Sequence, residues 1–217
     1  MINMDGMDQH KTSVPRPRTK CKQLESAGVP LVVKLLGAIA YGRKWYGYWC
    51  LPHWPATANV TLTGLCRVLK DVQETEGGRL PPKLHLQLDN AGRDNKNHYL
   101  VGFCGMLLQE RLFEEVEVHF LPVGHTHQEI DATFSKVANK VNQYGALSVQ
   151  DLMELAEGAW SGVHKDVGTD RKLQGCLDHV LDFRACLPHE GPLAVVHDFS
   201  GLGTLRTALP DGSTTKR

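Results

Sequence analysis

Apolar and polar residues alternate through the middle of the chain. In Lys83–Asp89, three leucines, Leu84, Leu86 and Leu88, are separated by polar side chains. A period of two is typical of a strand with one buried face. Residues 116–121 form a second short run of this kind, which ends before a proline. The pattern therefore predicts two strands with one polar face each.

Other apolar runs predict three strands near the N-terminus and four helices. The strands are expected at residues 1–5, 31–41 and 44–51, with Gly42-Arg43 as a hairpin turn between the last two. Spacings of three and four predict helices at residues 59–76, 95–113, 126–144 and 148–160. We expect an exposed loop at 9–28, a polar loop at 162–175 and short strands at best after it.

The order strand, strand, strand, helix, strand, helix, strand, helix predicts an α/β fold. A length of 217 residues allows one core and a small appendage. We expect a ribonuclease-H-like core at residues 1–145, with a mixed five-stranded sheet flanked by helices. Residues 146–217 would then form a C-terminal helix and an irregular extension. Aromatic residues of the hairpin are interpreted as sheet packing rather than as a base-stacking platform; they are Trp45, Tyr46, Tyr48 and Trp49.

Charge and cysteine content limit the classes of protein to consider. Basic and acidic residues number 24 each, so there is no overall positive field to gather nucleic acid, and a local patch would be needed. Six cysteines without a C-x-x-C pair fit a reducing intracellular compartment. No apolar run approaches the roughly 20 residues of a membrane span, so no membrane association is expected.

Three aspartates occupy positions suited to phosphoryl transfer. Asp5 ends the first expected strand, Asp89 ends the fourth, and Asp131 lies on the last core helix. A ribonuclease-H-like fold places its first and fourth strands side by side, with the last helix packed against their ends. Carboxylates that meet there would suit Mg²⁺ or Mn²⁺, and two ions about 3.5–4 Å apart activate water and stabilise the leaving oxygen. All three are therefore expected to be catalytic and metal-ligating.

The candidate acids also have purely structural interpretations. An aspartate that ends a strand often begins a turn, and Asp8 competes with Asp5 as the first acid. Glu129 competes with Asp131, but Thr126-His-Gln-Glu129 matches the S/T-x-x-E capping box. That match gives Glu129 a backbone partner and favours Asp131 as the ligand.

Two histidines lead into the same helix. His127 and Asp131 are four residues apart, which is one turn on the same helical face. Together with His125 they could hold Zn²⁺ and form a metal-dependent hydrolase. The histidines could equally orient the carboxylate, contact substrate phosphate or cap the helix.

An amide-rich, basic loop follows Asp89 and opens the next helix. Helix N-termini and lysine both favour phosphate, so the polar residues of this loop are candidates for substrate contact. An exposed loop with an asparagine N-cap is the alternative. The candidates are Asn90, Asn95, Lys96 and Asn97.

A composite signature joins these segments. It consists of Asp89-Asn90, Asn95-Lys96-Asn97, Phe120-Leu-Pro-Val-Gly-His-Thr-His127, and Asp131 with Phe134-Ser135. On these residues the chain resembles an uncharacterised eukaryotic domain family found in transposon-like genes. That family in turn looks like the ribonuclease-H-like catalytic core of DDE transposases and integrases.

The resemblance implies divalent-metal-dependent cleavage or strand transfer on DNA. It assigns the triad to Asp5, Asp89 and Asp131, and it implies DNA as a partner and a nuclear location. DDE transposases usually carry a separate DNA-binding module, and no such motif is evident here. We therefore expect either a fragment of a longer protein or a decayed element. The non-enzyme alternative is an inactive or domesticated domain that binds nucleic acid or protein.

Overall fold

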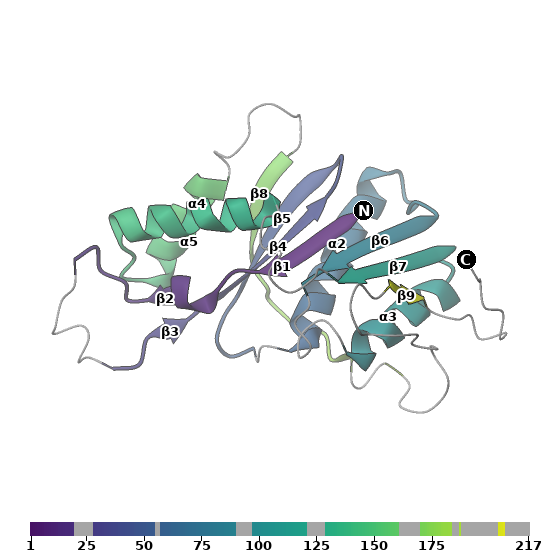
Figure 1. Cartoon of the computed structure of the whole chain (residues 1–217), viewed down its shortest axis with the longest axis horizontal. Helices are drawn as coiled ribbons and strands as arrows, with labels where there is room; N and C mark the ends of the chain where they lie inside the picture. Colours follow the sequence, from purple (N-terminus) through teal and green to yellow (C-terminus); the bar gives the residue numbers. More distant parts are fainter. Residues whose placement is uncertain are drawn as a thin grey trace. The chain divides into compact units, whose positions relative to one another are not determined.

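The described part of the chain divides into two units. The computed structural model describes residues 1–19, 28–54, 57–89, 97–120, 129–160, 170–183, 187 and 204–206. Unit 1 contains Met1–Met4, Pro55–His125 and His179–Arg217, and unit 2 contains Asp5–Trp54 and Thr126–Asp178. The division falls within strand β1 (Ile2–Gly6), so that strand contributes to both units. Figure 1 labels the elements of each unit.

Unit 1 is a mixed sheet with two helices. β1, β6 and β7 are parallel, and β9 pairs with β7 in the antiparallel direction. The bounds are β6 Lys83–Leu88, β7 Glu115–Phe120, β9 Thr204–Arg206, α2 Ala58–Thr75 and α3 His98–Gln109. Leu84, Leu86 and Leu88 are buried, whereas His85 and Gln87 between them are half-buried. The strand thus has one apolar and one polar face, as its alternation predicts.

Helix α2 ends where the sequence predicts, at a pair of glycines. Gly77 and Gly78 have φ of 73° and 91°, a backbone region that side chains with a Cβ rarely adopt. The N–H of Gly78 donates to the carbonyl of Gln73 over 2.8 Å, which satisfies one of the free carbonyls of the last turn. The expected helix at 59–76 is therefore confirmed.

Unit 2 packs two helices on the N-terminal strands. β4 and β5 form an antiparallel hairpin, and β8 pairs with β5 in the parallel direction. β2 and β3 form a separate small antiparallel sheet. The bounds are η1 Gln9–Lys11, β2 Ser13–Val14, β3 Leu31–Val32, β4 Lys34–Ala40, β5 Lys44–Cys50, α4 Glu129–Tyr144, α5 Val149–Trp160 and β8 Asp170–Cys176. The aromatic residues of the hairpin are at most 5% exposed, so the interpretation as sheet packing is confirmed.

Two glycines allow close packing on the hairpin. A Cβ at Gly37 of β4 would lie 2.8 Å from Cδ1 of Ile130 on α4. A Cβ at Gly47 of β5 would collide with Leu173 of β8 and lie 3.3 Å from Cζ2 of Trp160 on α5. The side chains of α4, α5 and β8 therefore share one core with β4 and β5. Residues on both sides of the expected boundary after residue 145 contribute to this core.

Two expected loops contain regular structure instead. Within 9–28, η1 and β2 form, and Thr12 and Val14 are buried at 0% and 4% exposure, so the prediction of an exposed loop is wrong there. Within 162–175, Asp170–Cys176 is strand β8. Its sequence hides this because, among the side chains of β8 that the structure describes, Leu173 alone belongs to the buried core. The predicted class, α/β with a mixed sheet, is confirmed; β8 is a strand within an expected loop, and β9 lies in the part of the chain where short strands at best were expected.

Four described cysteines are free thiols. Burial raises the pKa of the Cys104 thiol to about 12 and that of the Cys66 thiol to about 11. Both residues remain protonated near neutral pH, and a protonated thiol is a poor nucleophile and a poor metal ligand. They therefore act as small apolar residues.

Candidate metal centre

The polar face shared by β6 and β7 carries charged and imidazole side chains in register. Lys83 pairs with Glu115, His85 with Glu117, and Gln87 with His119. The opposite face of the two strands is apolar, with Leu86 and Val118 both at 0% exposure. Burial of that face fixes which residues face solvent, because a shift of one residue would turn the leucines outward.

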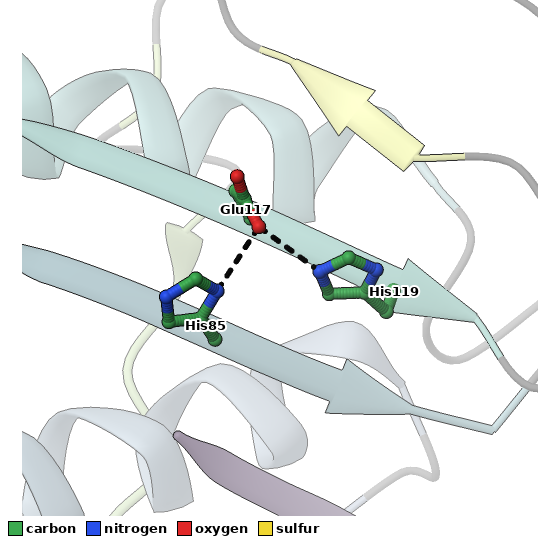
Figure 2. A group of neighbouring side chains, drawn as sticks. All are labelled: His85, Glu117 and His119. Carbon is green, nitrogen blue, oxygen red and sulfur yellow. Dashed lines mark hydrogen bonds and ion pairs between the residues drawn. The ribbon is translucent and has the colours of Figure 1, made fainter.

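Glu117 lies between two histidines. One of its oxygens, Oε2, is 3.0 Å from Nδ1 of His85 and 3.3 Å from Nε2 of His119. The side chain of Glu117 is 25% exposed, and those of His85 and His119 are 43% and 45% exposed. Figure 2 shows the three side chains directed toward one another from the two strands.

The histidines keep Glu117 ionised. Partial burial is the largest single effect and by itself raises the pKa of this carboxyl group. Hydrogen bonds and charge interactions with His119 and His85 act in the opposite direction and together outweigh burial, so the pKa of Glu117 is lowered. The carboxylate is therefore available near neutral pH as an acceptor or a metal ligand.

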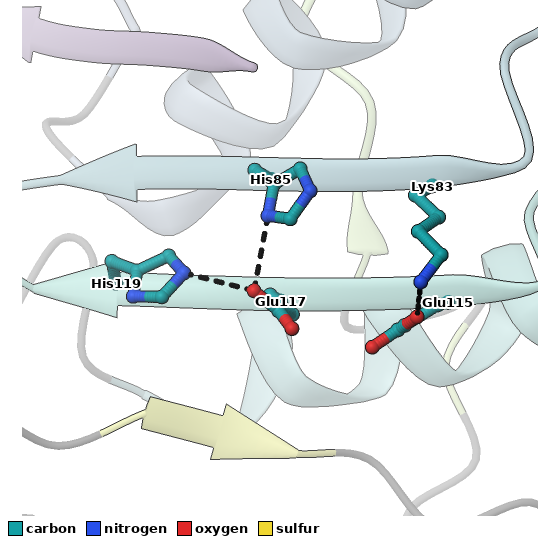
Figure 3. Close-up of polar contacts among 5 residues, drawn as sticks. All are labelled: Lys83, His85, Glu115, Glu117 and His119. Carbon is teal, nitrogen blue, oxygen red and sulfur yellow. Dashed lines mark hydrogen bonds and ion pairs between the residues drawn. The ribbon is translucent and has the colours of Figure 1, made fainter.

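A salt bridge lies beside this group on the same face. Nζ of Lys83 is 2.6 Å from Oε2 of Glu115, and both side chains are well exposed. Figure 3 shows this pair next to the Glu117 contacts, with no interaction drawn between the two. The hydrogen bond to Glu115 is the main cause of the raised pKa of Lys83. Lys83 thus pairs with Glu115, and the charge of Glu117 adds a smaller contribution to the raised pKa of Lys83.

His85, Glu117 and His119 are able to hold a metal ion. The three potential ligand atoms lie within 4.8 Å of one another. Among the described residues they are the one group of three histidine, cysteine or acidic side chains with this property. The sequence gives no sign of the group, because each member looks like an ordinary polar residue of an alternating strand. The register of β6 against β7 creates the cluster.

The predicted first and second acids follow paired residues of neighbouring strands. β1 and β6 run parallel, and the last pair in their register is Met4 with Leu88. Asp5 comes directly after Met4, and Asp89 comes directly after Leu88. Asp5 accepts a hydrogen bond from the backbone of Gly6 over 2.7 Å.

Asp131, the predicted third acid, lies in the first turn of α4. It is half-buried, as are Asp5 and Asp89. Asp8, the rival first acid, is exposed and accepts a hydrogen bond from the backbone of His10 over 3.0 Å, which caps η1. Asp8 therefore has a local structural role at the end of the strand.

Most of the predicted substrate-contacting residues lie outside the described residues. They are Asn90, Asn95, Lys96, His125 and His127. The capping box predicted for Thr126 and Glu129 also falls there in part, because Thr126 is not described. Asn97 is described and caps α3: its Oδ1 accepts from the backbone N–H of Tyr99 and Leu100 at 3.0 and 3.2 Å. An asparagine N-cap is the alternative to substrate contact expected from the sequence, and Asn97 is such a cap.

The fold is of the α/β class. Comparison with known families then shows to which family the chain belongs. Residues 23–200 match the model of a family described as Domain of unknown function (DUF7869). The chain belongs to this family. No curated protein and no solved structure matches it significantly. None of the described helices combines the length and the apolar character that crossing a bilayer requires.

Proposed function

We propose that this chain is a DDE-type nuclease or transposase domain that cleaves or transfers DNA strands with Mg²⁺ or Mn²⁺. Asp5, Asp89 and Asp131 would hold the ions. The observation that carries the proposal is the register of β1 and β6. Met4 and Leu88 are the last paired residues of these two parallel strands, and Asp5 and Asp89 are the residues that follow them in the sequence.

The neighbours of β1 also support a ribonuclease-H-like core. In unit 1, Met1–Met4 lies next to β6, with β7 beyond it, and all three strands are parallel. In unit 2, the N–H of Met7 donates to the carbonyl of Leu35 in β4 over 2.9 Å, and β4 pairs with β5. The parallel pairing of the first and fourth expected strands agrees with the expectation for a ribonuclease-H-like core.

Contacts of β4 support Asp131 as the third acid. Within unit 2, β4 is bonded to Met7, two residues after Asp5. The same strand is covered at Gly37 by Ile130, the residue before Asp131. One strand thus contacts the segments that carry Asp5 and Asp131. The proposal requires Asp89 to reach the same ions, since convergence of hard oxygen ligands makes a two-metal site.

Plasmid nicking tests the proposal directly. We expect the purified full chain to nick supercoiled DNA with Mg²⁺ or Mn²⁺ and to lose this activity with chelator. Asp89→Asn should abolish nicking while the circular dichroism spectrum is unchanged. Failure of the wild type to nick with either ion, or equal nicking by Asp89→Asn, would reject the nuclease. DNA binding without nicking would instead support an inactive binding domain.

Matched pairs of variants test the individual acids. Asp5→Asn should abolish nicking, whereas Asp8→Asn should leave it near the wild-type rate. On α4, Asp131→Asn should abolish nicking and Glu129→Gln should retain it. A reversal within either pair would move that ligand to the rival acid. The double variant His125→Ala/His127→Ala should retain metal-dependent nicking if these histidines only assist substrate binding, and its loss would favour the histidine-based hydrolase.

A further inference from the structure

We infer that His85, Glu117 and His119 form a second metal site, specific for a divalent transition metal of the Zn²⁺ type. The site lies on the polar face of β6 and β7, and its residues are not among the acids of the proposed nuclease centre. Two imidazole nitrogens and one carboxylate oxygen are donors that suit Zn²⁺, whereas Mg²⁺ and Ca²⁺ prefer oxygen alone. The donor set therefore selects a different ion from the one proposed for catalysis.

The spacing of the donor atoms fits tetrahedral coordination. With Zn²⁺ about 2.0–2.2 Å from each ligand atom, neighbouring ligand atoms are about 3.3–3.6 Å apart. Oε2 of Glu117 is 3.0 Å from Nδ1 of His85 and 3.3 Å from Nε2 of His119. Each residue offers one potential ligand atom, and these atoms lie within 4.8 Å of one another. Side-chain rotation would have to bring them to the spacing that the ion requires.

The scaffold holds the ligands in place before the ion binds. His85 and Glu117 are paired residues of adjacent parallel strands, and His119 follows Glu117 by two positions on the same face. The backs of both strands are buried through Leu84, Leu86, Val116 and Val118. Ligands carried by packed strands are positioned more precisely than ligands carried by loops. Exposure of the imidazoles leaves room for water to complete the coordination.

Metal binding requires a specific change at the histidines. An ionised carboxylate only accepts hydrogen bonds, so Nδ1 of His85 and Nε2 of His119 carry the protons in the metal-free protein. To bind Zn²⁺ through those nitrogens, each ring must give up the proton that it carries there. Each histidine thus exchanges a hydrogen bond to Glu117 for a bond to the metal.

Titration with ZnCl₂ alone tests the site. After treatment with chelator, the full chain should bind one equivalent of Zn²⁺, and this binding should depend on His85, Glu117 and His119. Glu117→Gln and His119→Gln should each weaken that binding at least about tenfold, because even loss of an outer partner of a metal ligand costs that much. Glu115→Gln is the matched control: it lies on the same strand and face, two residues from Glu117, and should bind as the wild type does. Absence of Zn²⁺ binding, or equal affinity in all variants, would overturn the inference.

Two further variants separate this site from the others. Asp89→Asn and His125→Ala/His127→Ala should both keep wild-type affinity for Zn²⁺, whatever their effect on nicking. If binding is lost in either variant, the ion belongs to that centre and the inference is wrong. If nicking fails and Zn²⁺ binding follows Glu117, only the proposed nuclease is rejected.

Spectroscopy identifies the ligands independently. Co²⁺ at the site should give visible absorption of a nitrogen and oxygen centre without a thiolate charge-transfer band, since cysteine is not among the ligands. In ¹⁵N spectra, added Zn²⁺ should move the proton of His85 from Nδ1 to Nε2 and that of His119 from Nε2 to Nδ1. A thiolate band, or binding without change at either ring, would contradict the assignment.

Discussion

His85 and Glu117 face each other across two parallel strands, with Nδ1 of the imidazole 3.0 Å from Oε2 of the carboxylate. Since His119 approaches the same oxygen through Nε2, at 3.3 Å, the two rings present different nitrogens to one acceptor. This asymmetry follows from geometry: one histidine comes from the neighbouring strand and the other from the same strand as Glu117.

The two histidines should therefore have opposite tautomers in the metal-free protein. At pH 8, we expect His85 to carry its proton on Nδ1 and His119 on Nε2. Long-range ¹H–¹⁵N correlation spectra distinguish these forms. Glu117→Gln should remove the difference, because an amide can donate as well as accept. Identical tautomers in the wild type would show that Glu117 does not orient both rings.

Asn97 should contribute to stability through its cap on α3. Asn97→Ala removes the acceptor for the N–H groups of Tyr99 and Leu100, and the loss of such a cap costs about 0.5–2 kcal/mol. Denaturant unfolding should show this decrease, and Asn97→Asp should restore most of the stability.

The same variants separate the two interpretations of Asn97. If its main role were substrate contact, Asn97→Ala would weaken DNA binding and leave the free energy of unfolding unchanged. Equal stability of the wild type and Asn97→Ala would therefore contradict the capping role.

Close packing at Gly37 should make this position intolerant of a methyl group. In Gly37→Ala the new Cβ would lie 2.8 Å from Cδ1 of Ile130 and 3.0 Å from Cζ of Phe134. Ile130 is completely buried, so a shift of its side chain must be taken up by the surrounding core. Overpacking of this kind costs about 1–3 kcal/mol, measurable by denaturant unfolding.

Gly6→Ala is the control for that substitution. No atom lies within 4 Å of a Cβ built at Gly6, and its backbone is outside the left-handed region. We expect its stability to be unchanged or higher by up to about 1 kcal/mol. Equal effects of the two substitutions would show that contact with Ile130 does not limit position 37.

The sequence predicted most of the elements but not the contacts between them. Leu84, Leu86 and Leu88 revealed β6 because burial of one face imposes a period of two. Nothing local specified that His85 would pair with Glu117, since register depends on how two strands pack on a common core. Strand β8 was missed for a related reason. Its sequence, Asp170–Cys176, has one large apolar residue, Leu173, which packs into the core against Gly47, so the strand lacks the alternation by which strands are recognised.

The reciprocal cap at the start of α5 should weaken in acid. Oδ2 of Asp151 accepts from the backbone N–H of Ser148 and Leu147 at 2.9 and 3.0 Å. In return, Oγ of Ser148 accepts from the N–H of Asp151 at 3.1 Å. The backbone bonds from Ser148 and Leu147 are the main causes of the lowered pKa of Asp151, and the Ser148 side chain adds to them. These hydrogen bonds therefore favour the ionised form of Asp151 in the folded protein.

A carboxyl group whose pKa is lower in the folded state stabilises the protein at pH values above its unfolded-state pKa, which is about 3.9 for aspartate. This stabilisation is lost as the pH falls through the folded-state pKa. Asp151→Asn should therefore melt at a lower temperature than the wild type at pH 7. The difference should narrow progressively as the pH is lowered below about 4.

Ser148→Ala should cost about 1 kcal/mol, and the double variant should lose less than the sum, since both changes break one coupled motif. Additive effects, or a melting difference that stays constant into acid, would show that the two side chains do not act together.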